Sequence, residues 1–97
     1  MITSNTNNFR LEFDNEAVEA VKAFENANKL ILTVVNNRSQ SDGYYIKIED
    51  VETEEVTIWY KKTFKKSIAL ELQNELAVFI QNNNTYVDIE LDYKRNW

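Results

Sequence analysis

The spacing of apolar residues changes along this chain between two periods, and this change restricts the possible folds more than any other feature. In several short segments apolar and polar residues alternate, as they do on a β-strand; in two longer segments apolar residues recur every three or four positions, as on one side of an α-helix. The segments follow one another in the order β-α-β-β-β-α-β. We therefore expect an α+β fold with two amphipathic helices on one face of a mainly antiparallel, four- to five-stranded sheet.

The first third of the chain contains two expected strands and one expected helix. Residues 9–13 alternate and predict a short strand. Asp14 is a typical N-cap, and it precedes a helical stripe of apolar residues over 17–27. Residues 30–35 are apolar at nearly every position, which favours a strand buried on both faces at the centre of the sheet.

The rest of the chain predicts three more strands and a second helix. A polar loop over 36–43 ends at the only glycine, Gly43. Residues 44–49 and 56–61 alternate on either side of an expected turn at 50–54. Residues 64–82 return to helical spacing, and residues 86–93 alternate without interruption, which predicts a last strand.

Length and composition fit one domain over residues 1–97, since 43% of the residues are apolar. Residues 1–8 are expected to form a flexible N-terminal arm, and residues 94–97 a frayed end. The chain lacks cysteine, a basic and apolar leader, and any apolar run of the roughly 20 residues needed to cross a bilayer. These features predict a cytoplasmic protein.

The composition leaves few groups for catalysis. The chain has no histidine, no cysteine and a single glycine, so common acid-base groups, thiol nucleophiles and glycine-rich phosphate loops are missing. A pair of carboxylates remains possible, but close pairs are inevitable among 16 acidic residues. We expect no enzyme activity, no cofactor and no metal site.

The formal charge of −5 points to the class of partner. A net-negative chain is repelled by phosphate groups and by anionic membranes, which argues against direct binding to nucleic acid or to a membrane. A protein partner with a basic surface is the electrostatically favoured alternative.

Two groups of acidic residues are the sharpest candidates for such binding. Asp88, Glu90 and Asp92 alternate on the last expected strand, so their side chains would share one face about 6.6 Å apart. A second group surrounds the turn at 50–54 and includes Glu49, Glu52 and Glu54. Together they could imitate a nucleic-acid backbone in the basic channel of a DNA-handling enzyme; the alternative is an ordinary solvated strand face. A divalent cation is disfavoured, because such ions take ligands from several loops.

Aromatic residues supply a second candidate surface. If both helices cover one face of the sheet, the other face is expected to carry Tyr45, Trp59 and Tyr86 together with Ile31 and Val35. An uncovered apolar and aromatic patch usually marks a protein interface, either with a partner or with a second copy of the chain. The alternative is that the N-terminal segment or the C-terminal end folds back over these rings.

In general type only, the chain is similar to the small acidic inhibitors that phages and other mobile elements encode. Anti-CRISPR proteins, DNA-mimic antirestriction proteins and toxin-immunity proteins belong to this type. The similarity implies a non-catalytic protein-binding module that inhibits a nucleic-acid-processing enzyme. The alternative is a self-assembling structural or regulatory homodimer, or a toxin-immunity protein.

Overall fold

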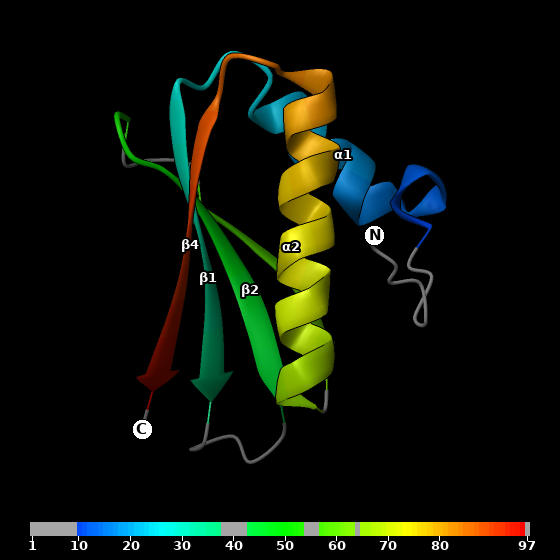
Figure 1. The fold of residues 1–97 in the computed structure, drawn as a ribbon, viewed down its shortest axis with the longest axis vertical. Coiled ribbons are helices and arrows are strands. Elements are labelled where there is room, and N and C mark those ends of the chain that lie inside the picture. Colours follow the sequence, from blue (N-terminus) through cyan, green and yellow to red (C-terminus); the bar gives the residue numbers. More distant parts are fainter. Residues whose placement is uncertain (1–9, 38–42, 54–56, 64, 97) are drawn as a thin grey trace.

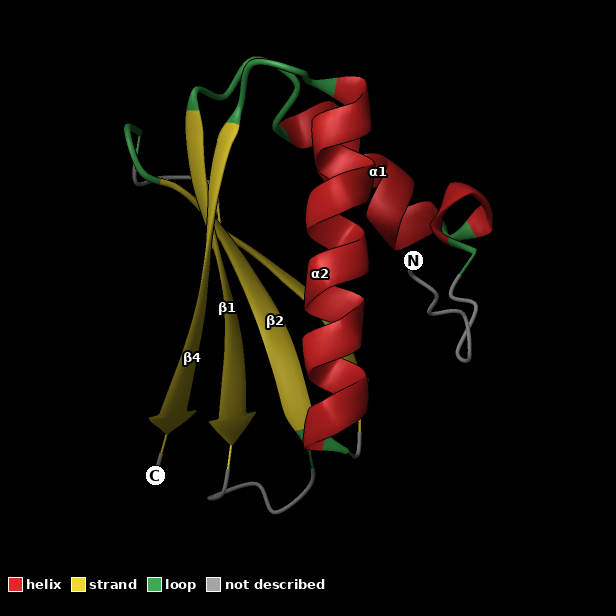
Figure 2. Cartoon of the chain, viewed as in Figure 1, coloured by secondary structure: helices red, strands yellow, loops and turns green. Residues whose placement is uncertain are grey.

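The computed structural model describes residues 10–37, 43–53, 57–63 and 65–96, and for residues 57–63 it describes the backbone alone. Both helices lie on the same side of one sheet, so the predicted α+β class and two-layer arrangement are confirmed (Figure 1 and Figure 2). The expected N-terminal arm lies outside the described residues. The elements are η1 (Leu11–Phe13), α1 (Asn15–Ala23), β1 (Lys29–Asn37), β2 (Tyr44–Asp50), β3 (Thr57–Thr63), α2 (Lys66–Asn83) and β4 (Asp88–Asn96).

The sheet is mixed, with two antiparallel pairs, β1–β2 and β2–β3, and one parallel pair, β1–β4. Strand β1 pairs antiparallel with β2 on one side and parallel with β4 on the other. The described strands form one sheet in the order β3-β2-β1-β4. Side chains are described for β2, β1 and β4, and only the backbone is described for β3. The parallel pair arises because α2 carries the chain back across the sheet before β4 begins, so that β4 runs in the direction of β1 (Figure 1).

The predicted strand at 9–13 is wrong, because residues 11–13 form a 3-10 turn. Arg10 has a left-handed backbone with φ of 53°, and the N–H groups of Phe13 and Asp14 donate to the carbonyls of Arg10 and Leu11, both at 3.0 Å. Leu11 is buried while Phe13 is 74% exposed. Alternation alone could not show that this segment has no neighbouring strand to pair with.

The predicted N-cap at Asp14 is confirmed. Its carboxylate accepts hydrogen bonds from the backbone N–H groups of Glu16 and Ala17 at 3.0 and 3.5 Å. These bonds satisfy donors that would have no partner in the first turn of α1. The cap therefore explains why α1 begins directly after the 3-10 turn.

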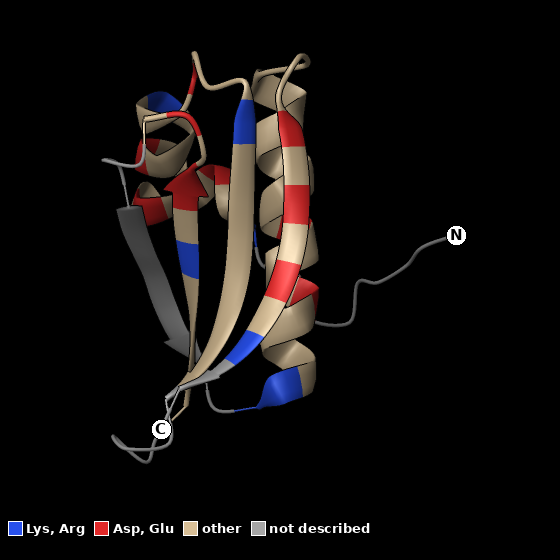
Figure 3. Cartoon of the chain, turned by 90° about the vertical axis from the view of Figure 1, so that its left-hand side faces the viewer, with Lys and Arg blue, Asp and Glu red and all other residues tan. Residues whose placement is uncertain are grey.

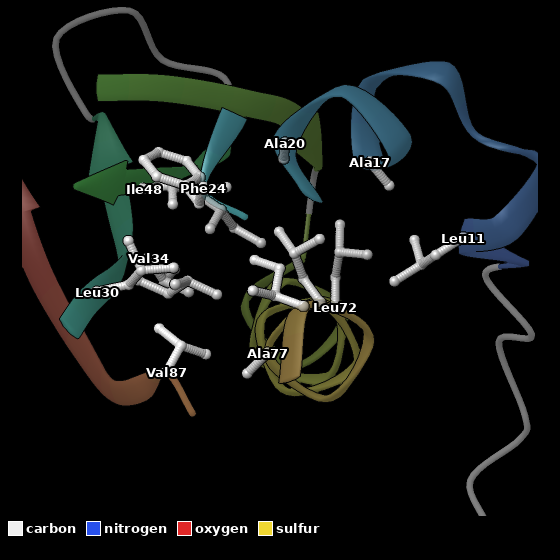
Figure 4. Packing of buried hydrophobic residues seen from close by; sticks show 14 of the residues in the cluster. Leu11, Ala17, Ala20, Phe24, Leu30, Val34, Ile48, Leu72, Ala77 and Val87 are labelled. Atoms are coloured by element: carbon white, nitrogen blue, oxygen red, sulfur yellow. The ribbon is translucent and has the colours of Figure 1, made fainter. Parts of the chain in front are cut away.

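The core fills the space between the sheet and the helices. From β1 and β2 it takes the alternate residues that face the helices, and from the helices it takes one stripe each (Figure 4). Full burial of a large aliphatic side chain contributes roughly 1.5–3 kcal/mol, so this layer is the main source of stability. The largest fully buried side chains are Phe24, Leu30, Leu32, Val34, Ile46, Ile48, Leu72, Leu76 and Ile80.

One polar side chain in this layer attaches α2 to the two parallel strands. Gln73 is only 4% exposed, and its Nε2 donates to the backbone carbonyls of Leu32 in β1 and Asp92 in β4, at 2.7 and 2.8 Å. Buried amides need such partners, because an unsatisfied polar group costs free energy in an apolar layer. Gln73 therefore fixes the position of β4 relative to both β1 and α2.

Candidate protein-binding surface

The three alternating acids of β4 lie on the sheet face that no helix covers, called here the open face. Asp88, Glu90 and Asp92 are the register partners of Lys29, Ile31 and Thr33, whereas the intervening residues of β4 pair with the core residues of β1. All three acids are exposed. They form one line along β4 in the view onto the open face (Figure 3), and we call them the acidic row.

Two lysines border the acidic row: Lys29 is the register partner of Asp88, and Lys94 follows Asp92 on the same face of β4. No ion pair to Asp88 or Glu90 occurs among the residues that the structure describes. The Asp92 carboxylate accepts a hydrogen bond from the backbone N–H of Tyr93 at 2.8 Å, which orients the group without neutralising it. Like charges on alternate residues repel one another, so this line favours a ligand that brings positive charge.

Glu49 lies on the same face, but its charge is partly compensated by an ion pair. It is the register partner of Ile31 on β2, and its carboxylate forms an ion pair with the Lys47 ammonium at 3.4 Å. The Glu49 side chain is 39% exposed and the Lys47 side chain is 30% exposed. An ion pair this accessible contributes about 0–1 kcal/mol, so Glu49 can exchange Lys47 for a partner's cation at small cost.

The second acidic group lies at the end of the sheet where β4 begins. The Asn28 side chain donates to the Glu52 carboxylate at 3.0 Å, and the Asn28 carbonyl accepts from the backbone N–H of Asp88 at 2.9 Å. Asn28 thus connects the turn after β2 to the start of the acidic row. Asp50 Oδ1 accepts from the N–H of Glu52 at 2.9 Å and shapes this turn. Glu54 lies outside the described residues.

Of the three predicted aromatic residues, the structure places Tyr45 on the open face and Tyr86 in the turn before β4. Tyr45 is half-buried on the open face, opposite Val35. Trp59 is the register partner of Lys47, but its side chain lies outside the described part of the chain. Tyr86 was expected in the last strand; it lies in the turn before β4, with its backbone N–H donating to Asn84 Oδ1 at 3.3 Å and its side chain 91% exposed.

The centre of the open face is also less accessible than expected. Val35 is 7% exposed and Thr33 only 3%, although no helix lies over them. In register, Thr33 is flanked by the longer side chains of Lys47 and Asp92. The described residues of this face therefore present charges, not the exposed apolar patch that the sequence suggested.

Sequence reasoning missed the apolar residues beside the outer edge of β4. Leu91 belongs to the face that the helices cover, yet 44% of it is exposed, and Leu70 of α2 is 37% exposed. Strand β4 is the last strand in the order β3-β2-β1-β4, so Leu91 lies at a border of the sheet. Only the contrast between the uniformly apolar β1 and the alternating β4 could have suggested an edge position.

The described residues contain no group of three or more His, Cys, Asp or Glu side chains arranged to hold a metal ion. In the same residues, no helix is both long and apolar enough to span a membrane. The chemical feature of this surface is a line of carboxylates along β4, the last strand of the sheet. No family model matches the chain, and no curated protein or solved structure is similar to it above the level of chance.

Proposed function

We propose that this chain is a non-catalytic protein-binding module that docks its acidic row on a basic surface of a larger protein. The observation that carries this proposal is the row itself: three exposed carboxylates at alternate positions of one edge strand, on a face that no helix covers. Glu49 and Glu52 extend the negative charge toward the second acidic group.

The row is suited to a partner that normally binds nucleic acid. Alternate residues of a strand are about 6.6 Å apart, so the carboxylates form an evenly spaced line of negative charge. A basic groove evolved for phosphates attracts such a line, because complementary potentials favour both encounter and alignment. We therefore propose an inhibitor of a nucleic-acid-processing enzyme, acting in the cytoplasm by occupying the enzyme's basic groove, as DNA mimics and anti-CRISPR proteins do.

A panel of nucleases and restriction enzymes tests this proposal. Each enzyme is assayed with and without the protein at about 0.15 M salt, and direct binding to the inhibited enzymes is measured by calorimetry. We expect inhibition of at least one enzyme, with binding that weakens steeply as salt increases, because added ions screen the carboxylates. An absence of inhibition and binding across the panel would contradict the proposal.

A matched pair of variants separates the acidic row from net charge. The first carries Asp88→Asn, Glu90→Gln and Asp92→Asn. The second carries Glu12→Gln, Glu19→Gln and Glu25→Gln, which are exposed positions on or beside η1 and α1. Each variant loses three negative charges and changes the net charge from −5 to −2. Binding should fall at least about 100-fold in the first variant and less than about 5-fold in the second. Equal losses would show that net charge, not the row, drives binding.

A further inference from the structure

Among the residues that the structure describes, no strand pairs with the outer edge of β4. Strand β4 stands last in the order β3-β2-β1-β4, and it extends over nine residues. Its inner edge is paired with β1 along its whole length. An edge of this kind presents a row of backbone donors and acceptors, and proteins bind extended peptides there by adding a strand.

The register shows which backbone groups face outward. The N–H of Asp88 donates to the carbonyl of Asn28, so Asp88 directs its backbone groups toward β1. In a parallel ladder these directions alternate along the strand. Ile89, Leu91 and Tyr93 therefore direct their N–H and C=O groups toward the outer edge, where the Tyr93 N–H already donates to Asp92 Oδ1 at 2.8 Å.

The two sides of this edge differ chemically. On the open face, the edge is bordered by the acidic row. On the helix face it is bordered by Leu91 and by the side of α2 that faces β4. Lys66 and Gln73 mark that side: the Lys66 ammonium lies 4.5 Å from the centre of the Tyr93 ring, and Gln73 binds the Asp92 carbonyl. Leu70 lies between them at helical spacing and is 37% exposed.

We infer that β4 binds a partner segment by strand addition, and that this segment alternates basic and apolar residues. Its basic side chains would lie beside Asp88, Glu90 and Asp92, while its apolar side chains would cover Leu91 and Leu70. Backbone pairing along the edge of β4 would set the register between the two. This inference deepens the proposed function and rests on it, because it specifies how the acidic row meets its partner.

A second copy of this chain is a poor occupant of the same edge. Two β4 strands paired antiparallel about a two-fold axis at Glu90 would place Asp88 opposite Asp92 and the two Glu90 carboxylates opposite each other. Directly opposed like charges destabilise a strand pair. The net charge of −5 adds a general repulsion. The charge pattern therefore selects a basic segment over self-pairing.

The test uses a short peptide that alternates lysine and valine, with both ends blocked, and two N-methylated isomers of it. One isomer carries N-methyl groups on its valine nitrogens and the other on its lysine nitrogens, so the three peptides have the same charge. Only one edge of the peptide can pair with β4 while its valine side chains lie on the helix face. In an antiparallel arrangement the backbone N–H and C=O groups of the valines face β4, and in a parallel arrangement those of the lysines do. We expect one isomer to bind at least about 10-fold more weakly than the parent peptide while the other binds unchanged. Equal binding of the isomers, or no binding of the parent peptide, would overturn strand addition.

A variant of β4 provides the complementary measurement. Leu91→Pro removes an outward N–H, and proline is tolerated in edge strands where the N–H faces solvent. Leu91→Ala is the matched control, because it shortens the side chain and keeps the N–H. We expect the parent peptide to bind Leu91→Pro about 10-fold more weakly than Leu91→Ala. Circular dichroism of both variants verifies the fold, and the peptide isomers decide the question if Leu91→Pro does not fold.

The neutralised row distinguishes failure of this inference from failure of the proposed function. If the isomers bind alike and the triple change at Asp88, Glu90 and Asp92 abolishes binding, charge docking stands and strand addition is wrong. If the isomers differ and the triple change has no effect, strand addition stands and the acidic row is not the docking element. Increased protection of the Leu91 amide from hydrogen exchange in the parent complex supports pairing; unchanged protection contradicts it.

Discussion

Strands β1 and β4 lie side by side in parallel, yet their side chains differ in exposure at each pair from Lys29–Asp88 to Val35–Lys94. Leu32 is fully buried, while its register partner Leu91 is 44% exposed. On the other face, Thr33 is 3% exposed and its partner Asp92 is exposed. The two strands share direction, length and neighbouring backbone. Their difference therefore comes from position alone: β1 has strands on both sides, and β4 has one side free.

This difference teaches which positions maintain the fold and which are available for binding. In β1 both faces are occupied, so a substitution on either face should affect stability. In β4 the open face and the outer edge are free, so substitutions there should affect binding and leave stability nearly unchanged. The paired positions allow direct tests, because each compares two residues at the same height in the sheet.

The largest effect is expected from moving an acid between the strands. Thr33→Asp would place a carboxylate at a site 3% exposed, next to the Asp92 position and opposite Lys47, whose ammonium already pairs with Glu49. Burying an unpaired charge costs about 3–5 kcal/mol, so the free energy of unfolding, measured by urea titration, should fall by that amount. The reverse change in the neighbouring strand, Asp92→Thr, should alter it by less than about 0.5 kcal/mol. Similar costs at both positions would show that the open face of β4 is as enclosed as that of β1.

The second comparison is between the paired leucines. Leu32→Ala should reduce the free energy of unfolding by about 2–5 kcal/mol, because a fully buried side chain leaves a cavity. Leu91→Ala should reduce it by about 1 kcal/mol or less, since half of its surface already contacts water. Thermal and urea unfolding of the two variants provide the measurement. A large cost at Leu91 would mean that this side chain is covered in solution.

A smaller effect is expected at the residue that joins the two strands. Gln73→Leu keeps the volume and removes both hydrogen bonds to the carbonyls of Leu32 and Asp92. The expected loss is about 1–3 kcal/mol, together with faster hydrogen exchange of the β4 amides. Gln81→Leu is a control on the same helix, because its bond to the Val87 carbonyl is longer, at 3.5 Å. Exchange that increases equally in both variants would assign the effect to α2 as a whole.

The smallest effect is expected from neutralising the acidic row. The triple change Asp88→Asn, Glu90→Gln and Asp92→Asn should alter the free energy of unfolding by less than about 1 kcal/mol, and a slight gain is expected at low salt as repulsion disappears. Asn at position 92 retains an oxygen for the Tyr93 N–H. Urea unfolding at low and high salt measures both effects. A loss above about 2 kcal/mol would show that the row has a structural role.

Sequence periodicity correctly predicted the helices and strands that bury a continuous stripe of apolar side chains. The unbroken apolar run of β1 indicated a strand buried on both faces, and Asp14 marked the start of α1. Local pattern could not show that residues 11–13 lack a strand to pair with. It also could not show that β4 joins β1 in parallel, because that pairing depends on the path of α2 across the sheet.

The candidate site was predictable only in part, for the same reason. Alternation placed Asp88, Glu90 and Asp92 on one face, which the structure confirms. Tyr86 was misplaced because the strand begins two residues later than the alternation suggests. From the sequence alone, Gln73 is an ordinary polar helix residue. It can be buried because its amide donates to backbone carbonyls of two strands that are distant in the sequence. The exposure of Leu91 depends on the place of β4 as the last strand of the sheet, which no local pattern contains.

The return of the chain from β3 through α2 to β4 also has a consequence for synthesis and folding. Strands β2 and β3 and helix α2 separate β1 from β4 in the sequence, so the contact between β1 and β4 forms only after these elements have been synthesised. Contacts between segments so distant in sequence form slowly. Until then, the edge of β1 that later pairs with β4 can pair with other newly synthesised chains. Once β4 has paired with β1, the acidic row lies at the edge of the sheet. The same segment that we propose for recognition would therefore also protect the newly synthesised protein from aggregation.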